Sequence, residues 1–486
     1  MYQVNNVTAI GSEMTTLHQQ LHWMTLTEVA NSIRQRDISV SEIIESSLQR
    51  IEQVRPEINA FIEVFADEAR EAATEADRRL QCGSPVGPLF GVPIGYKDMF
   101  SQLGKRASGA SRIMGDVKPL ATATVLRRLK DAGAINIAAL NMSEFAAGPT
   151  GHNDHFGHCR NAWHQDHVSG GSSSGSGAAT AAGAVYAAIG SDTGGSVRLP
   201  AAFNGLVGLK PTWGRISRHA TMPRSWTLDT VGPLTRTTAD CALMTSVIAG
   251  YDTLDSTTSQ LSVPDYMSCL DASVRGLRVG VPANYFRDDI SDEINELFED
   301  ACQVLIEQGC QVKIIEVPDP GEYDAIANAI SKTEAASIHS KWMREQPQNY
   351  GLHAYSRTEF GFHVPATMYV DALSVRGAVM RDFVSKVFSK VDVMLTPVLN
   401  FEVPTIDETD ERNPERISSM VGRITRNTRP FNYLGLPALT VPCGFTANHL
   451  PVGLQIVGRP FAETQLFTLA SAYEKSTPWK DFHPSL

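Results

Sequence analysis

The chain has 486 residues, of which 42% are hydrophobic and 20% are charged, and its formal net charge is -11. This composition is typical of a globular protein and excludes an intrinsically disordered chain. The acidic balance argues against nucleic acid or an anionic membrane as the main partner. The chain shows no signal-peptide pattern, no apolar window of 18 residues and no CxxC pair among its seven cysteines. We therefore expect a reduced, soluble, cytoplasmic protein without a membrane partner.

The predicted elements begin after a polar arm at residues 1–24. Ser39 and Glu42 have the spacing of a capping box, and the apolar residues after them repeat at helical intervals, which predicts a helix. An Ala-rich, charged helix is expected over about 66–80. The segment PLFGVPIGYKD (88–98) predicts a short buried strand with Lys97 at its end.

The second half of the predicted elements alternates between strands and helices. TATVLRRLKDAGA predicts a helix closed by Gly133, and INIAAL predicts a strand. LRVGVP, SDEINELFEDACQVLIEQG and CQVKIIEVP predict a strand–helix–strand unit, and VDVMLTPV and PALTVPC predict buried strands. The polar stretch 251–274 is the best candidate for a break between two halves. Such alternation indicates an α/β protein with helices on both faces of its sheet.

Two clusters rich in Gly and Ser lie in the middle of the chain. The first, VSGGSSSGSGAATAAGAV (168–185), has the composition of a linker, but a helix-forming Ala run and a strand-like run follow it directly. Residues 171–175 also match G-x-S-x-G, the nucleophile elbow of α/β-hydrolases. That elbow requires a strand immediately before it, and HCRNAWHQDHVS does not predict one. Both interpretations are therefore rejected.

The second cluster, GSDTGGSVR, is a better candidate for a catalytic serine. A strand-like run ends at Asp192, and Thr193–Gly195 then form a tight turn that leads into Ser196. Successive backbone amides in such a turn can converge on an oxyanion. A serine nucleophile also needs a base, and no histidine lies near it in the sequence.

Together these motifs resemble the amidase signature family over nearly the whole chain, from about Thr25 to the C-terminus. GVPIGYKD is similar to the family's lysine strand. GGSSSGSGAATAAG and GSDTGGSVRLPAAFNGLVGLKPTWGRIS are similar to its signature, and SWTLDTVGPLTRT and RPFNYLGLPALTVPCG to later landmarks. The resemblance implies a single α/β/α domain over residues 25–486, with a mixed central sheet and a signature core at about 88–240.

The resemblance also implies the site residues. The nucleophile is Ser196, the bridging serine is Ser172, and the base is Lys97. The two serines are 24 positions apart, as in the family, whereas Ser174 stands where many members have Gly. Family members hold the bridging serine through a cis peptide bond. The remaining site residues are Thr193, Gly194, Gly195 and Ser173 for the oxyanion or substrate, and Asp192 and Arg198 in support.

The proposed base imposes a physical condition on its surroundings. Lysine accepts a proton only when it is neutral, so Lys97 must be buried enough to lower its pKa from about 10.4. On a strand, Lys97 and Asp98 point to opposite faces, so Asp98 need not hold the lysine in its charged form.

A histidine-rich segment, GHNDHFGHCRNAWHQDH (151–167), lies just before the first cluster. None of its spacings matches a helical HxxxH or a CxxC pair, so we predict no metal site and no cofactor. We expect a surface loop that leads into the serine cluster, and the sequence leaves the role of the histidines open.

The resemblance implies an amidase that hydrolyses C–N bonds through an acyl-enzyme. Its partner is a small-molecule amide, and a homodimer remains open. The aromatic-rich segment 338–370 is expected to form a loop or broken helix over the pocket, which favours a neutral, partly apolar or aryl amide over glutamine. The alternative is that these aromatic residues pack in the core. Alternatives are a glutamine-hydrolysing subunit of a tRNA-dependent amidotransferase, a ureide or carbamate hydrolase, and a binding protein with a degenerate site.

Overall fold

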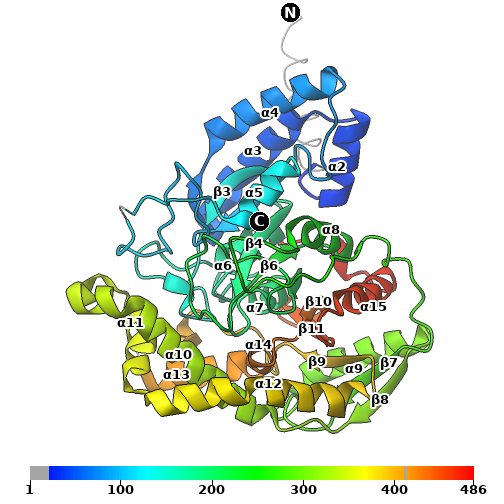
Figure 1. Ribbon diagram of the computed structural model, residues 1–486. Coiled ribbons are helices and arrows are strands. Elements are labelled where there is room, and N and C mark those ends of the chain that lie inside the picture. The colour runs from blue at the N-terminus through cyan, green and yellow to red at the C-terminus, as the bar shows by residue number, and fades with distance from the viewer. Residues whose placement is uncertain (1–20, 116, 410–411, 413) are drawn as a thin grey trace, which may run out of the picture.

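The computed structural model describes residues 21–115, 117–409, 412 and 414–486 (Figure 1). Most of the predicted arm at 1–24 therefore lies outside the described residues. In the described part of the chain, no helix combines the length and the apolar character that are needed to cross a membrane. All seven cysteines are free thiols, and all but Cys82 are buried.

Eleven strands form one continuous mixed sheet. Their order across the sheet is β1-β3-β2-β4-β6-β5-β10-β11-β9-β7-β8. The pairs β2–β3, β2–β4, β7–β8 and β7–β9 are parallel, and the other pairs are antiparallel. The strands are β1 Phe61–Val64, β2 Pro93–Lys97, β3 Ile135–Leu140, β4 Ala187–Asp192, β5 Val207–Lys210, β6 Thr230–Thr235, β7 Arg278–Pro282, β8 Gln311–Ile315, β9 Val393–Pro397, β10 Ala438–Phe445 and β11 Pro451–Val457. The predicted α/β class with a mixed sheet is confirmed.

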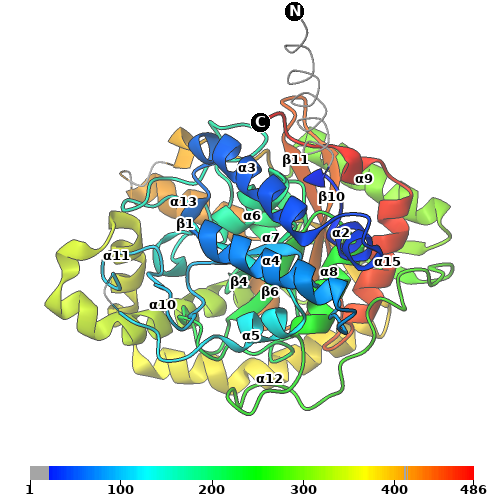
Figure 2. The same cartoon turned by 90° about the horizontal axis from the view of Figure 1, so that it is seen from above.

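Helices cover both faces of this sheet (Figures 1 and 2). They are α2 Leu26–Gln35, α3 Val40–Ile58, α4 Ala66–Gln81, α5 Thr124–Asp131, α6 Ser174–Ala181, α7 Arg198–Phe203, α8 Thr238–Ile248, α9 Asp292–Glu307, α10 Pro320–Glu345, α11 Leu352–Glu359, α12 Ala366–Phe388, α13 Pro414–Thr425, α14 Arg429–Tyr433 and α15 Glu463–Lys475. Figure 2 shows α3 and α4 lying together above the strands, and Figure 1 shows α10, α11 and α12 gathered at one side of the molecule.

Local sequence signals account for several of these boundaries. The predicted capping box is present at α3, where the Ser39 hydroxyl accepts a hydrogen bond from the Glu42 amide and the Glu42 carboxylate accepts one from the Ser39 amide. The helix α5 ends just before Gly133, whose φ of +92° suits glycine. Segment 338–370 forms a broken helix, because short 3-10 turns interrupt the path from α10 through α11 to α12.

The topology brings two sequence motifs to the same edge of the sheet. The parallel strands β2 and β4 are neighbours, with Tyr96 paired to Ile189, so their carboxyl ends lie together. Lys97 closes β2, and Asp192 closes β4 directly before the predicted nucleophile turn. Ligand sites of α/β proteins typically lie at the carboxyl ends of such strands.

Candidate active site

Lys97 is fully buried, and its amino group faces two serine hydroxyls. The Nζ atom lies 2.7 Å from Ser172 Oγ and 2.9 Å from Ser191 Oγ. In the described part of the chain, no carboxylate forms an ion pair with it. Burial lowers the pKa of Lys97 to about 7, and the charges of Asp229 and Asp192 only partly oppose this shift. At neutral pH a large fraction of Lys97 can therefore be unprotonated, as a general base requires.

Asp98 is directed away from this lysine. Its carboxylate accepts hydrogen bonds from the hydroxyl and amide of Ser108 and from the amide of Ala110. Burial raises the pKa of Asp98 to about 6, and these hydrogen bonds limit the rise. Asp98, which directly follows β2, is therefore engaged by the 108–110 segment and not by the candidate base.

The glycine-rich tract packs tightly around Ser172. The peptide bond between Gly171 and Ser172 is cis, and the Ser172 carbonyl accepts a hydrogen bond from the Ser143 amide. A Cβ atom at Gly171 would lie 2.7 Å from the carbonyl oxygen of Gly148, too close for any other residue without rearrangement. The abundance of glycine thus reflects close backbone packing around a buried hydroxyl, and the tract is no linker.

Ser191 is a contact of the lysine that the sequence analysis did not identify. Its hydroxyl lies 3.0 Å from the Sδ atom of Met99, to which it donates. A hydroxyl has one proton, so this geometry leaves its lone pairs for the N–H groups of Lys97. The only feature of the sequence that could have pointed to Ser191 is its position directly before Asp192 in the signature.

The predicted nucleophile turn is held by a buried ion pair. Arg198 donates from Nε and Nη2 to the two carboxylate oxygens of Asp192, both at 3.0 Å, and neither side chain is exposed. Asn432 donates to the same carboxylate at 2.8 Å. Although burial raises the pKa of Asp192, the charge and hydrogen bonds of Arg198 hold it below its ordinary value. Asp192 thus remains an anion that anchors the turn.

The backbone amides of the turn differ in availability. Gly195, with a φ of +134°, donates its amide to Asp192 Oδ1 at 2.8 Å, so that donor is occupied. Among the described residues, the amides of Thr193, Gly194 and Ser196 have no hydrogen-bond partner. The Thr193 hydroxyl donates to Asp229 at 2.5 Å. The turn therefore has three amides that can face an oxyanion, one of them from Ser196 itself.

Ser196 lies beside the Ser172 segment. Its carbonyl oxygen accepts a hydrogen bond from the Ser173 amide at 3.3 Å, and the residue is 8% exposed. The Ser173 hydroxyl donates to the carbonyl oxygen of Ser191 and thereby joins α6 to β4. Within the described ranges, the Ser196 hydroxyl makes no hydrogen bond. The structure thus brings Lys97, Ser172 and Ser196 to one edge of the sheet, with a direct side-chain contact only between the first two.

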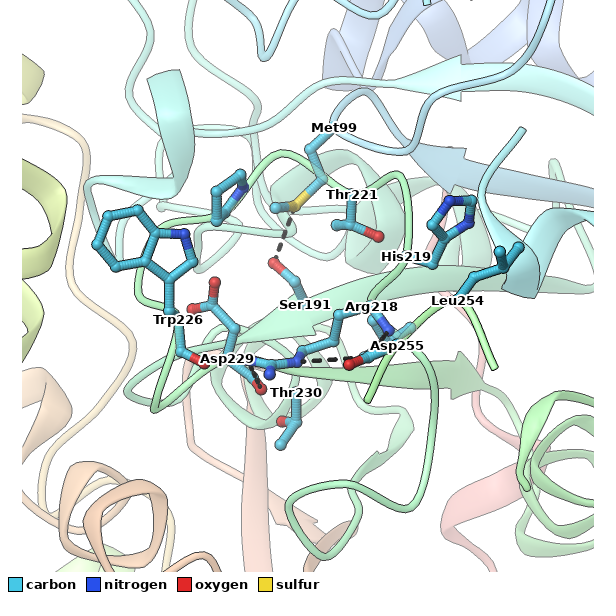
Figure 3. A pocket seen from close by; sticks show the side chains of 12 residues that line it. Met99, Ser191, Arg218, His219, Thr221, Trp226, Asp229, Thr230, Leu254 and Asp255 are labelled. Atoms are coloured by element: carbon cyan, nitrogen blue, oxygen red, sulfur yellow. Dashed lines mark hydrogen bonds and ion pairs between the residues drawn. The ribbon is translucent and has the colours of Figure 1, made fainter. Parts of the chain in front are cut away.

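A cavity of about 300 Å³ is lined in part by Ser191, whose hydroxyl contacts Lys97 Nζ (Figure 3). Among its lining residues, Ser191 and Met99 are buried, Arg218 and Asp255 are half-buried, and Trp226 is exposed. The cavity contains none of the aromatic residues of 338–370. Trp342 and Tyr350 instead pack against Phe145, Tyr355 packs against Tyr350, and Phe360 and Phe362 are about half exposed. The expected aromatic lining from that segment is therefore not found in this cavity.

The histidine-rich segment forms ordinary structural contacts. His155 pairs with Glu144 at 3.0 Å, and His167 contacts the carbonyl oxygen of Val403 at 2.7 Å. Across the described ranges, no three His, Cys, Asp or Glu side chains are placed so that they could hold a metal ion.

Comparison with known proteins assigns the chain to a family. The Amidase family matches residues 42–467, so the chain belongs to this family and is an amide-hydrolysing enzyme. It is 38% identical to one subunit of the glutamyl-tRNA(Gln) amidotransferase of Moorella thermoacetica, over 96% of this chain and 99% of that protein.

Two solved structures show the same fold along most of the chain. The corresponding amidotransferase subunit from Thermotoga maritima superposes with a TM-score of 0.79 at 32% identity, covering 94% of this chain and 96% of the other. A bacterial aryl acylamidase of the amidase signature family superposes with a TM-score of 0.84 at 26% identity, covering 95% and 98%. The resemblance noted in the sequence is confirmed.

Proposed function

We propose that the enzyme hydrolyses a small amide through an acyl-enzyme on Ser196, with Ser172 as the proton relay and Lys97 as the base. The observation that carries this proposal is the 2.7 Å contact between Lys97 Nζ and Ser172 Oγ. Because the lysine is buried without an ion-pair partner among the described residues, its neutral form is accessible near pH 7. A neutral amine in contact with a serine hydroxyl is suited to accept a proton through that hydroxyl.

In acylation, Ser196 Oγ attacks the amide carbon while its proton passes to Ser172 Oγ, and the Ser172 proton passes to Lys97 Nζ. The negative charge moves to the carbonyl oxygen, which the amides of Thr193, Gly194 and Ser196 stabilise. The C–N bond then breaks, and the proton returns from Lys97 through Ser172 to the leaving nitrogen. Ammonia or an amine departs, and the acyl group stays on Ser196.

In deacylation, water replaces the departed amine. Its proton passes through Ser172 to Lys97 as its oxygen attacks the ester carbon. Collapse of this second intermediate breaks the bond to Ser196 Oγ, which takes the proton back. The products are a carboxylic acid and the free enzyme, so no group from outside the chain and the substrate is consumed except water.

Glutamine is the first candidate substrate, which reverses the preference expressed from the sequence. The relative from Moorella thermoacetica matches over nearly its entire length, and its name describes one subunit of an amidotransferase. By that likeness the chain would release ammonia from glutamine and work with a partner protein. This alternative has better support than a free-standing amidase.

A free-standing hydrolase of another small amide is the second candidate. One observation favours it, since the aryl acylamidase superposes with a TM-score of 0.84 and the amidotransferase subunit with 0.79. In this case the purified chain alone would be fully active, and a small-molecule amide would be its only partner.

Ammonia or amine release by the purified chain tests the proposal. We expect turnover of glutamine or of a member of a panel of aliphatic and aryl amides. Ser196→Ala should lower kcat by about 10³-fold or more because the nucleophile is lost. Ser173→Ala is the matched control, and it should retain more activity than Ser196→Ala.

The outcome separates the candidates. Turnover of glutamine that rises when a co-expressed partner is present supports the amidotransferase role, whereas full activity of the lone chain on a different amide supports the second candidate. Equal activity of wild type and Ser196→Ala on every amide would contradict both.

A further inference from the structure

A group of cationic side chains lies beside the nucleophile turn, on the side of α10 and α11. It consists of Arg224, Lys332, Arg357 and Arg429, which we call the cation cluster. The Cγ atom of Arg429 would lie 3.5 Å from a Cβ atom at Gly194, so this arginine packs directly against the turn. The Arg224 amide donates to Asp229, the same carboxylate that accepts the Thr193 hydroxyl. The Arg429 side chain and the Arg224 backbone are therefore one contact away from the turn that carries the proposed oxyanion amides, and the Arg224 guanidinium is close enough to Asp229 to sense its charge.

Arg224 is buried and lacks a paired acid. Its residue is 3% exposed, and among the described residues its guanidinium makes one hydrogen bond, from Nη1 to Thr358 Oγ1 at 3.2 Å, and no ion pair. Burial lowers the pKa of Arg224 to about 10, and the nearby charge of Asp229 only partly opposes this. A buried guanidinium with most of its five donors unused is costly unless an anion uses them.

Lys332 adds a second unpaired cation. Its Nζ atom lies 3.9 Å from the centre of the Phe360 ring, and within the described ranges it makes no hydrogen bond or ion pair. Burial lowers its pKa to about 8, and the charges of Arg357, Arg429 and Arg224 lower it further in the same direction. Lys332 is half-buried, so solvent reaches the cation cluster at this residue.

The acids near the cluster are already engaged. Both carboxylate oxygens of Asp324 accept a hydrogen bond from Arg429 Nη1, at 2.9 Å each. Asp229 accepts hydrogen bonds from Thr193, Arg224 and Ser225, and Glu334 accepts them from Ser225, Thr227 and Tyr369. The buried His339 and His353 add no compensating charge of either sign, because burial lowers the pKa of both. Among the described residues, Arg224 and Lys332 thus have no acid that forms an ion pair with them.

We infer that the acyl half of the substrate carries a carboxylate, which Arg224 and Lys332 bind while the amide carbon lies at Ser196. This inference rests on the proposed function, and it names the substrate class for that same site. The carboxylate would provide the anion that the two unpaired cations lack, and Arg224 offers the planar donor arrangement that suits it. It replaces the neutral, partly apolar or aryl amide that the sequence predicted.

Glutamine and the half-amides of dicarboxylic acids share this carboxylate. Glutamine also carries an ammonium group, and the acids that could accept it near the cluster are already engaged. The half-amide of glutaric acid is glutamine without that ammonium, and pentanamide lacks both charges. The three compounds have the same carbon chain and differ only in their charged groups. Comparing them therefore measures the effect of the carboxylate and the effect of the ammonium group separately.

The experiment measures kcat/KM for ammonia release from paired substrates. The half-amides of malonic, succinic and glutaric acid are each compared with the neutral amide of the same chain length, and glutamine is included. We expect the best half-amide, or glutamine, to exceed its neutral counterpart at least tenfold. Lys332→Met should remove most of this ratio and leave the neutral amide within twofold of wild type. Lys341→Met, an exposed lysine of the same helix, should leave the ratio unchanged.

Arg224→Lys provides a second test that keeps the charge and removes the planar donors. It should raise KM for the acidic substrate and leave kcat for the neutral amide unchanged. A wild type that cleaves neutral amides as well as the acidic ones would overturn the inference and leave the proposed function intact. Loss of acidic and neutral turnover to the same degree in Lys332→Met would also overturn it. No release from any substrate, glutamine and aryl amides included, would overturn the proposed function itself.

Discussion

The amino group of Lys97 and the hydroxyl of Ser172 lie 2.7 Å apart, although the two residues are 75 positions apart in the chain. Lys97 ends a buried strand, and Ser172 lies in a cis-linked, glycine-rich segment before α6. Burial keeps the lysine close to neutrality, and the packed glycine backbone fixes the hydroxyl against it. This pair links the fold to the proposed chemistry.

The first prediction concerns the pH dependence of activity. Because burial lowers the pKa of Lys97 to about 7, kcat/KM should rise with pH and reach half of its plateau near pH 7. An exposed lysine would place this midpoint above pH 9. Initial rates between pH 5 and 10 check the prediction, and a midpoint above pH 9 would exclude Lys97 as the base.

The same pKa predicts how stability depends on pH. Between about pH 7 and 10.5 the unfolded chain binds a proton on this lysine that the folded chain releases, so the lysine makes stability rise with pH across this window. Lys97→Met removes that contribution, and its stability advantage over wild type should be largest near pH 7 and shrink by pH 10. Urea unfolding at the two pH values measures the difference, and an unchanged difference would show that Lys97 titrates normally.

Substitution of Ser191 should change the activity and the pKa of Lys97 and leave the fold intact. Ser191→Ala removes one acceptor from the Lys97 amino group, so we expect kcat to fall about tenfold. The midpoint of the pH profile should also move to lower pH, because the lost hydroxyl favoured the ammonium form. Ser191→Thr retains the hydroxyl and should restore both values. An Ala variant with wild-type kcat and pH profile would show that the contact is dispensable.

Removal of Arg198 should strongly reduce stability. Arg198→Met leaves the Asp192 carboxylate buried without its cation, which should lower the free energy of unfolding by about 3–5 kcal/mol. The partly exposed pair of Arg278 and Asp392 is a matched control, and Arg278→Met should cost no more than about 1 kcal/mol. Equal losses in both variants would mean that the turn does not depend on its buried ion pair.

The sequence predicted the elements whose local signals are strong. The capping box of Ser39 and Glu42, the glycine after α5, and the strand that ends at Lys97 depend on neighbouring residues, and the structure contains all three. The prediction of a mixed sheet followed from family resemblance, since strand order depends on contacts between distant segments that periodicity does not encode.

The remaining site features depend on tertiary contacts. The contact of Ser191 with Lys97 requires β2 and β4 to be neighbours, and Asn432 reaches Asp192 across 240 positions. The sequence predicts an aromatic wall from Trp342 and the aromatic residues after it, but Trp342 and Tyr350 pack against Phe145, and Phe360 and Phe362 are about half exposed. Composition identified an aromatic-rich segment, and it could not show which way those side chains face.

Covalent trapping identifies the nucleophilic serine directly. A fluorophosphonate, which reacts with an activated serine, is added to the enzyme at pH 8, and peptide mass spectrometry locates the adduct. We expect an adduct on Ser196, its absence in Ser196→Ala, and a much slower reaction in Lys97→Met. An adduct on Ser173 or Ser172 in the wild type would contradict the assignment of the nucleophile.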